Sequence, residues 1–253
     1  MNKKIIFSIF VCLIVGIFSF KFPTDIPRCS AGDTKCIVDV SNEFIELNGK
    51  KGHKGLGLIQ IDPLHIPSIG IKQGEKSPVN IALDFKDVDL IGLSNCRFTK
   101  ISGFQRNPTG KYELVVKGPA LYLVGPYKIA GRVLILPVNG EGRSNITLVD
   151  PELIFTFDGK AAKRGNHEHL DIENANLIFK VSRLIFDFRH LYNGDQLLGD
   201  ATNRFLNENW NDIFKEISEN IFDAFTLIAE STLKNIFNKV PYNDLFADSG
   251  KKS

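Results

Sequence analysis

The residues best suited to chemistry in this chain are two histidines beside an acidic residue, in the segment His167-Glu168-His169 followed by Asp171. Alternate side chains of a strand point to the same face, so both imidazoles could approach one zinc ion. The preceding residues 160–166 are rich in Lys, Arg, Gly and Asn, which is typical of a solvated turn. Because the spacing supplies no third strong ligand, the sequence predicts no metal site and no cofactor.

Motifs for nucleophilic catalysis and nucleotide binding are missing from the sequence. It contains no G-x-S-x-G nucleophile elbow and no Walker A loop, and the Gly-Leu-Gly at 55–57 lacks the third glycine of a dinucleotide fingerprint. The Ser-Thr-Leu-Lys at 231–234 fits S-x-x-K, but its leucine belongs to an apolar helical stripe, so we interpret the match as coincidence. His65 and His190 are interpreted as packed or capping residues. The sequence therefore predicts a protein without enzymatic activity.

Residues 196–246 carry the most regular pattern of the chain, an apolar stripe with steps of three and four. This spacing predicts one very long amphipathic helix of roughly 40 residues, about 60 Å in length. Asp200 and Asn203 could cap its start, and Pro241 marks its end. Such a helix needs a partner along its whole length. The apolar positions are Phe205, Leu206, Trp210, Ile213, Phe214, Ile217, Ile221, Phe222, Phe225, Ile228, Leu233, Ile236, Phe237 and Val240.

The region before this helix is predicted to form mainly strands, each bounded by Pro, Gly or Asn. Residues 79–85 alternate strictly, with Val79, Ile81, Leu83 and Phe85 on one face. A short helix is expected upstream, ending at Asn48-Gly49. The other predicted strands are residues 58–62, 97–105, 112–122, 127–136, 145–157 and 176–188, with a glycine turn at 140–142.

Long antiparallel strands followed by one long helix predict an α+β fold, in which a strongly curved antiparallel sheet wraps the C-terminal helix. We find no repeat and no linker, so residues 20–246 are expected to form a single domain. Periodicity does not distinguish an interior that is packed with side chains from one that is hollow.

The N-terminal segment of the chain predicts secretion. Lys3 and Lys4 precede an apolar run over residues 5–20, so residues 1–19 are expected to be a cleaved signal peptide. The alternative is an uncleaved anchor, but about 16 apolar residues are few for spanning a bilayer. No second apolar stretch is long enough, so no stable membrane insertion is expected. Residues 247–253 are predicted to be a disordered tail.

In an oxidising compartment, Cys29 and Cys36 are expected to form a disulfide. Cys96 is then left either as a buried free thiol or as a bridge to another molecule. Asn145 begins an N-glycosylation sequon in an expected surface turn. The net charge of +2, without basic runs longer than a pair, excludes nucleic acid as an expected partner.

Several segments resemble the insect takeout and haemolymph juvenile hormone-binding family. They are residues 193–200 and 203–210 at the start of the long helix, the strands 125–129 and 131–137 with the glycine segment 140–142, the Cys29-x6-Cys36 pair, residues 61–66 and residues 240–246. The likeness covers about residues 29–246. Juvenile hormone-binding members have a second disulfide, for which this chain lacks cysteines, so it is similar to the takeout-like branch.

The resemblance implies a tubular fold with an apolar tunnel between helix and sheet. The implied function is that of a secreted carrier for a small hydrophobic molecule, such as a juvenile hormone, another isoprenoid or a fatty chain, linked to circadian rhythm, feeding or chemosensation. A secreted interaction protein that acts through its surface, and lipid exchange at membranes, remain alternatives. The expected tunnel residues are Leu83, Phe85, Tyr122, Leu134, Phe179, Trp210, Phe214, Ile217, Ile221 and Phe225.

Overall fold

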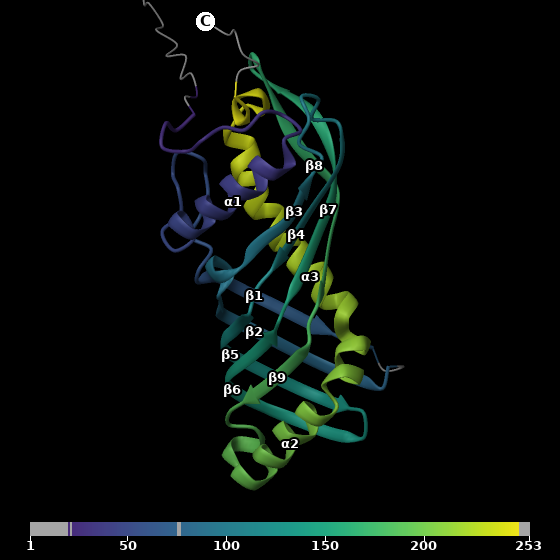
Figure 1. Ribbon diagram of the computed structural model, residues 1–253. Helices are drawn as coiled ribbons and strands as arrows, with labels where there is room; N and C mark the ends of the chain where they lie inside the picture. Colours follow the sequence, from purple (N-terminus) through teal and green to yellow (C-terminus); the bar gives the residue numbers. More distant parts are fainter. Residues whose placement is uncertain (1–19, 21, 75–76, 248–253) are drawn as a thin grey trace, which may run out of the picture.

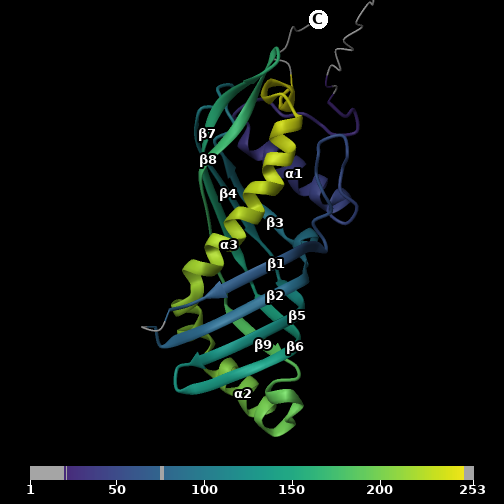
Figure 2. The same cartoon turned by 180° about the vertical axis from the view of Figure 1, so that it is seen from behind.

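The computed structural model describes residues 20, 22–74 and 77–247 of the 253-residue chain. The predicted signal peptide and nearly all of the predicted tail lie outside these residues. Within them, nine strands form two antiparallel sheets, in the orders β1-β2-β5-β6-β9 and β3-β4-β7-β8. The sheets follow one another along the C-terminal helix α3 and curve around it (Figures 1 and 2). The α+β fold expected from the sequence is confirmed, with the wrapping sheet divided in two.

The elements have the following bounds. The helices are α1 (Thr34–Asn48), α2 (Gln196–Glu208) and α3 (Trp210–Lys239), with short 3-10 helices η1 (Leu93–Asn95), η2 (Tyr192–Gly194) and η3 (Tyr242–Leu245). The strands are β1 (Leu64–Lys72), β2 (Val79–Ile91), β3 (Arg97–Ser102), β4 (Gly110–Lys117), β5 (Ala120–Val133), β6 (Leu136–Val149), β7 (Glu152–Arg164), β8 (His167–Lys180) and β9 (Arg183–Phe188). None of the described helices is long and apolar enough to cross a membrane.

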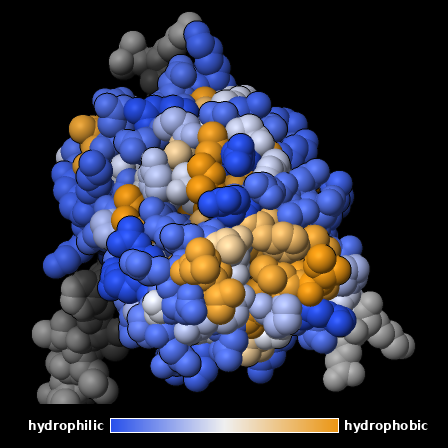
Figure 3. Space-filling model, turned by 90° about the horizontal axis from the view of Figure 1, so that it is seen from below, coloured by the Kyte–Doolittle hydropathy of each residue, from blue (hydrophilic) through white to orange (hydrophobic). Residues whose placement is uncertain are grey.

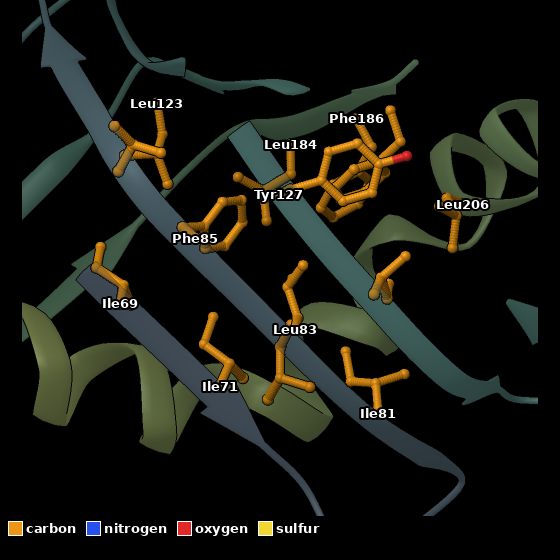
Figure 4. Packing of buried hydrophobic residues seen from close by; sticks show 14 of the residues in the cluster. Ile69, Ile71, Ile81, Leu83, Phe85, Leu123, Tyr127, Leu184, Phe186 and Leu206 are labelled. Atoms are coloured by element: carbon orange, nitrogen blue, oxygen red, sulfur yellow. The ribbon is translucent and has the colours of Figure 1, made fainter. Parts of the chain in front are cut away.

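The alternation predicted for residues 79–85 sets the inner face of the five-stranded sheet. Val79, Ile81, Leu83 and Phe85 are all at most 4% exposed. Each of them pairs with a residue of β5, and the paired residues face the same side of the sheet. Figure 4 shows Leu83, Phe85 and Tyr127 projecting to the same side of these strands. Apolar side chains therefore line the concave side of the sheet.

The predicted single helix is two helices. Asn209, with φ −106° and ψ 17°, separates α2 from α3, and its side-chain amide donates to the carbonyl of Phe205. The start of α2 is capped by Asp195, whose carboxylate accepts from the Leu198 amide at 3.0 Å, and not by Asp200 or Asn203. The expected end is confirmed, since α3 stops two residues before Pro241.

Asn203 has another role, because side-chain amides of α2 pair with the free edge of β9. Asn203 accepts from the Phe188 amide at 2.9 Å and donates to the Phe188 carbonyl at 2.8 Å. Asn207 does the same with Phe186, at 2.7 and 2.8 Å. These bonds replace those of a neighbouring strand and cover an edge that would otherwise be open to further strand pairing.

The four-stranded sheet is also bonded to helices at both of its edges, through a paired amide on β3 and a single hydroxyl on β8. On β3, Asn42 of α1 accepts from the Phe98 amide at 2.7 Å and donates to its carbonyl at 3.0 Å. On β8, the Thr226 hydroxyl of α3 accepts from the Leu177 amide at 2.8 Å. The helices are thus joined to the sheets by directional bonds as well as by apolar packing.

Four of the predicted strands are wrong in extent because the chain turns inside them. Residues 112–122, 127–136, 145–157 and 176–188 are interrupted between β4 and β5, β5 and β6, β6 and β7, and β8 and β9. Residues 59–61 form no strand, and Leu58 makes only an isolated bridge with His53. The expected glycine turn lies inside β6, where Gly140 and Gly142 approach the backbone of the segment after β9 so closely that a Cβ would collide with it.

The surface turn expected around Asn145 is also absent. Asn145 lies within β6, paired with Val124 on one side and Asp187 on the other. Its Oδ1 is buried and makes no hydrogen bond with the described residues. Glycosylation at this position stays a prediction.

The N-terminal part of the described chain is held by a disulfide and by one buried carboxylate. Cys29 and Cys36 form the expected disulfide, while Cys96 is a buried free thiol whose pKa is raised to about 11, mainly by burial. The Asp62 carboxylate accepts from the amides of Gly92 and Ser94 at 2.9 and 3.0 Å, and from the Ser94 hydroxyl. Burial by itself would raise the pKa of Asp62, but these hydrogen bonds outweigh it and the net shift lowers the pKa.

Candidate ligand-binding cavity

An internal cavity of about 460 Å³ lies between α3 and the two sheets. This volume falls within the usual range of small-molecule sites, about 300–1,000 Å³. Its lining is almost wholly apolar, and none of the described lining residues is charged. The interior is therefore hollow over part of its length, which the periodicity of the sequence does not reveal.

One face of α3 forms a continuous side of the cavity. Phe214, Ile217, Ile221, Phe225 and Ile228 follow at steps of three or four, so all lie on one stripe of the helix. This stripe is the one that the sequence predicts for the inner face of the long helix. It ends at Ile236 and Phe237, near the C-terminus of α3.

The facing wall comes from strands of both sheets. Leu83 and Phe85 of β2 line it from the five-stranded sheet, and Phe179 of β8 from the four-stranded sheet. Phe179 contacts three aromatic rings of α3, with centroid distances of 5.5 Å to Phe214, 5.0 Å to Phe222 and 6.3 Å to Phe225. Such tilted and edge-on pairs add to the packing of the wall at this level.

Seven of the ten residues expected in the tunnel lie in the cavity wall, and three do not. The seven are Leu83, Phe85, Phe179, Phe214, Ile217, Ile221 and Phe225. Trp210 stands at the start of α3 and packs against the solid part of the core. Leu134 is in the two-residue turn between β5 and β6, with φ 54°.

Tyr122 lies on the outer face of β5 with 38% of its surface exposed. The sequence predicts a single strand over residues 112–122, with Tyr122 at its end. The chain leaves the sheet at Gly118-Pro119, between β4 and β5. After this interruption the alternation of inward and outward side chains starts anew. Leu121 and Leu123 point inward, and Tyr122 points outward.

The other end of the cavity is built by residues that are not among those expected from the sequence to line the tunnel. Phe22, Ile26 and Pro27 cover it, together with α1 and the segment that carries Leu56 and Leu58. The apolar stripe of α1 at Ile37, Val40 and Phe44 is the signal that could have found this part, since all three line the cavity. Leu47, three residues after Phe44 on the same helix, is exposed.

Toward α2 the interior is packed and the cavity stops. Tyr127 and Phe188 stack obliquely at 4.7 Å, and the Tyr127 hydroxyl donates to the Arg189 carbonyl at 2.9 Å. Leu206 of α2 and Ile213 of α3 are both 3% exposed in the same cluster and do not line the cavity. The cavity is therefore blind at the α2 end.

Two of the residues considered for a metal site, His169 and Asp171, are engaged in structural contacts. The His169 ring is buried and its Nδ1 lies 2.9 Å from the Phe237 carbonyl, while Asp171 pairs with Arg164. His167 is exposed at the β7–β8 turn. Within the described part of the chain, no group of three His, Cys, Asp or Glu residues could hold a metal ion.

The remaining candidates lie on the surface. Ser231 is exposed, and Lys234 pairs with Glu230 at 2.6 Å. His65 and His190, which the sequence predicts to be packed or capping residues, are both exposed, so neither is packed in the core. His65 contacts Asp89, and His190 contacts a backbone carbonyl of β6.

Two curved antiparallel sheets on one long helix, with an apolar cavity between helix and sheets, have the architecture of a binding protein for small apolar molecules. The sequence profile of the haemolymph juvenile hormone binding protein family matches residues 6–247, so the chain belongs to this family. The family consists of binding proteins for small hydrophobic ligands.

Comparison with individual proteins agrees with this assignment. The circadian clock-controlled protein daywake of Drosophila melanogaster is 25% identical over 230 residues, covering 89% of this chain and 88% of the Drosophila protein. The daywake protein of Drosophila yakuba is 24% identical over the same length. The crystal structure of Takeout 1 from Epiphyas postvittana matches with a TM-score of 0.75 and 20% identity, over 87% of this chain and 99% of that chain, which shows the shared fold.

Proposed function

We propose that this protein is a secreted, non-enzymatic carrier that encloses one small hydrophobic molecule in its internal cavity. The observation that carries the proposal is the cavity itself, about 460 Å³ of space with an almost wholly apolar lining. Each 100 Å² of apolar ligand surface removed from water contributes about 2.5 kcal/mol. Association costs offset part of this gain, so we expect dissociation constants in the micromolar range for a long-chain ligand.

Secretion is part of the proposal. The Cys29–Cys36 disulfide suits an oxidising compartment, and the description of the family refers to haemolymph. Juvenile hormone, other isoprenoids and fatty chains are the ligand classes to test. The circadian wording in the names of the Drosophila relatives makes abundance across a light–dark cycle the first physiological measurement.

The direct test is to purify the secreted protein from a eukaryotic host and to analyse it by native mass spectrometry before and after organic extraction. A lipid that co-purifies, or displacement of N-phenyl-1-naphthylamine by isoprenoid and fatty compounds after extraction, would support the carrier. A protein that arrives without ligand and binds neither the fluorescent probe nor any of these compounds would contradict it.

The second candidate function, an interaction protein acting through its surface, is favoured by one observation. The α2 end carries strongly exposed apolar side chains, Ile135 at 87%, Leu197 at 82% and Leu198 at 51%, and Figure 3 shows apolar residues gathered on this end. Replacing Ile135 and Leu197 by Asp separates the two functions. A carrier should bind ligand unchanged in this variant, whereas an interaction protein should lose its activity while its cavity still fills.

A further inference from the structure

The outer face of the five-stranded sheet carries a row of exposed apolar side chains. Ile91 of β2 pairs with Tyr122 of β5. Thr147 of β6 pairs with Tyr122 on one side and with Ile185 of β9 on the other, so the row crosses four strands. Ile91, Tyr122 and Ile185 are 39%, 38% and 39% exposed. Single apolar residues on a surface are ordinary, whereas neighbours in one row form a patch.

Asn145 lies on the same outer face, two residues before Thr147. Ile146, between them, lines the cavity, so the alternation of the strand turns Asn145 and Thr147 outward. In the register of the sheet, Tyr122 and Ile185 are the diagonal neighbours of Asn145. Such neighbours lie about 7–8 Å apart, which is within reach of a group attached to the asparagine.

The two polar atoms of the Asn145 side chain differ in exposure. Its Oδ1 is buried and has no hydrogen-bond partner among the described residues. Its Nδ2 makes no hydrogen bond with them either, but it is not buried. The nitrogen is therefore the atom of this amide that reaches the surface. It is also the atom to which N-glycosylation attaches a sugar.

The sequon is complete on this face of the sheet. Thr147 supplies the hydroxyl residue two positions after Asn145, and the residue between them is not proline. The Thr147 hydroxyl makes no hydrogen bond with the described residues. A valine at this position would therefore remove the sequon without removing a bond of the fold.

We propose that Asn145 carries an N-linked glycan whose first sugars lie over Tyr122 and Ile185 and cover the exposed row. The inference rests on the secretion that is part of the proposed function, and it does not involve the cavity. In the transfer, Nδ2 loses one proton and bonds to the anomeric carbon of the first sugar. The donor, a polyprenyl diphosphate-linked oligosaccharide of the secretory compartment, loses its polyprenyl diphosphate as the leaving group. Because the acceptor segment must be accessible, transfer precedes the pairing of β6 with β5 and β9.

The surroundings of Asn145 favour this direction for the glycan. The C–H faces of pyranose rings are apolar and pack against aromatic and aliphatic side chains such as those of Tyr122 and Ile185. On the other side of Asn145, Arg143 is exposed and Arg189 pairs with Asp187 at 3.3 Å, so that part of the surface is charged and hydrated. A bulky hydrated group over the apolar row would also raise solubility.

The first measurement is the mass of the peptide that contains Asn145, in protein secreted by eukaryotic cells. Treatment with a peptide N-glycosidase should remove a glycan and convert Asn145 to Asp. Thr147→Val should abolish the modification, and Thr147→Ser, which keeps the sequon, should retain it. Unmodified Asn145 in the secreted parent protein would overturn the inference.

The second measurement is nitration by tetranitromethane, which reports how far Tyr122 is covered. Enzymatic removal of the glycan from the folded protein should speed nitration of Tyr122 severalfold, and Thr147→Val should react like the deglycosylated parent. Tyr192 is the internal control, because its hydroxyl donates to the Pro137 carbonyl at 2.7 Å, near the opposite end of β6. Equal nitration of Tyr122 with and without the glycan would overturn the proposed cover.

Failure of this inference and failure of the proposed function give different results. Protein that stays inside the cell would contradict secretion, and the same chain delivered by the leader of a known secreted protein would then test the glycan by itself. Thr147 does not line the cavity, so parent and Thr147→Val should bind N-phenyl-1-naphthylamine equally. A glycosylated protein that binds no hydrophobic compound would contradict the carrier and leave this inference intact.

Discussion

Replacing Ala229 by Phe distinguishes a hollow interior from a filled one by the sign of its effect on stability. Ala229 lies on α3 and lines the cavity. A buried aromatic side chain removes about 150 Å² or more from water, which at about 25 cal/mol per Å² is a gross gain of nearly 4 kcal/mol. Side-chain entropy and the lower helix propensity of Phe together offset about 1–2 kcal/mol.

We therefore expect the ligand-free Ala229→Phe protein to be about 2–3 kcal/mol more stable than the parent, or about 4–12 °C higher in Tm. The same ring should obstruct the cavity and weaken probe binding at least about tenfold, because a long chain would have to displace it. Urea unfolding and probe titration on extracted protein measure the two effects.

Ala224→Phe is the control on the same helix. Ala224 packs against the buried cluster and does not line the cavity, so a larger side chain there should cost about 1–3 kcal/mol and leave binding near the parent value. If both variants were destabilised alike and Ala229→Phe still bound probe, the reasoning from an empty cavity would be refuted.

Three further predictions concern binding, acid stability and the sheet edge. Ile217→Glu should abolish probe uptake, whereas Leu227→Glu, at a position 67% exposed on the same helix, should bind normally; equal binding by folded forms of both would remove Ile217 from the site. The pKa of Asp62 is lower in the folded protein, so its contribution to stability is present above about pH 4 and is lost as the pH falls below that value; Asp62→Asn should cost about 1.5–3 kcal/mol at pH 7 and flatten this acid dependence in urea titrations. Asn207→Ala should cost about 1–3 kcal/mol and speed hydrogen exchange at the Phe186 amide, and unchanged exchange would show that this edge does not depend on the side chain.

The apolar periodicity predicted the long helix and the inner faces of the strands because both depend on local spacing. The stripe of α3 and the alternation of β2 are regular over more than two turns or six residues, and the structure keeps them. The break at Asn209 was missed because Leu206, Trp210 and Ile213 keep steps of four and three across it. A local change of backbone direction need not alter that spacing.

The cavity was harder to predict because it depends on volume and on chain reversals. Periodicity marks which side of a strand is inside but not whether the inside is full. The position of Tyr122 was predicted on the wrong face because Gly118-Pro119 interrupts a segment that is apolar on both sides of the turn. Leu134 has a positive φ in a turn without the usual glycine or asparagine, so nothing in its residue type indicates the reversal.

The paired amides of Asn42, Asn203 and Asn207 have a consequence for the unloaded protein. These hydrogen bonds join the helices to the sheet edges whether or not the cavity holds a ligand. The ligand-free protein should therefore keep the same fold as the ligand-bound one.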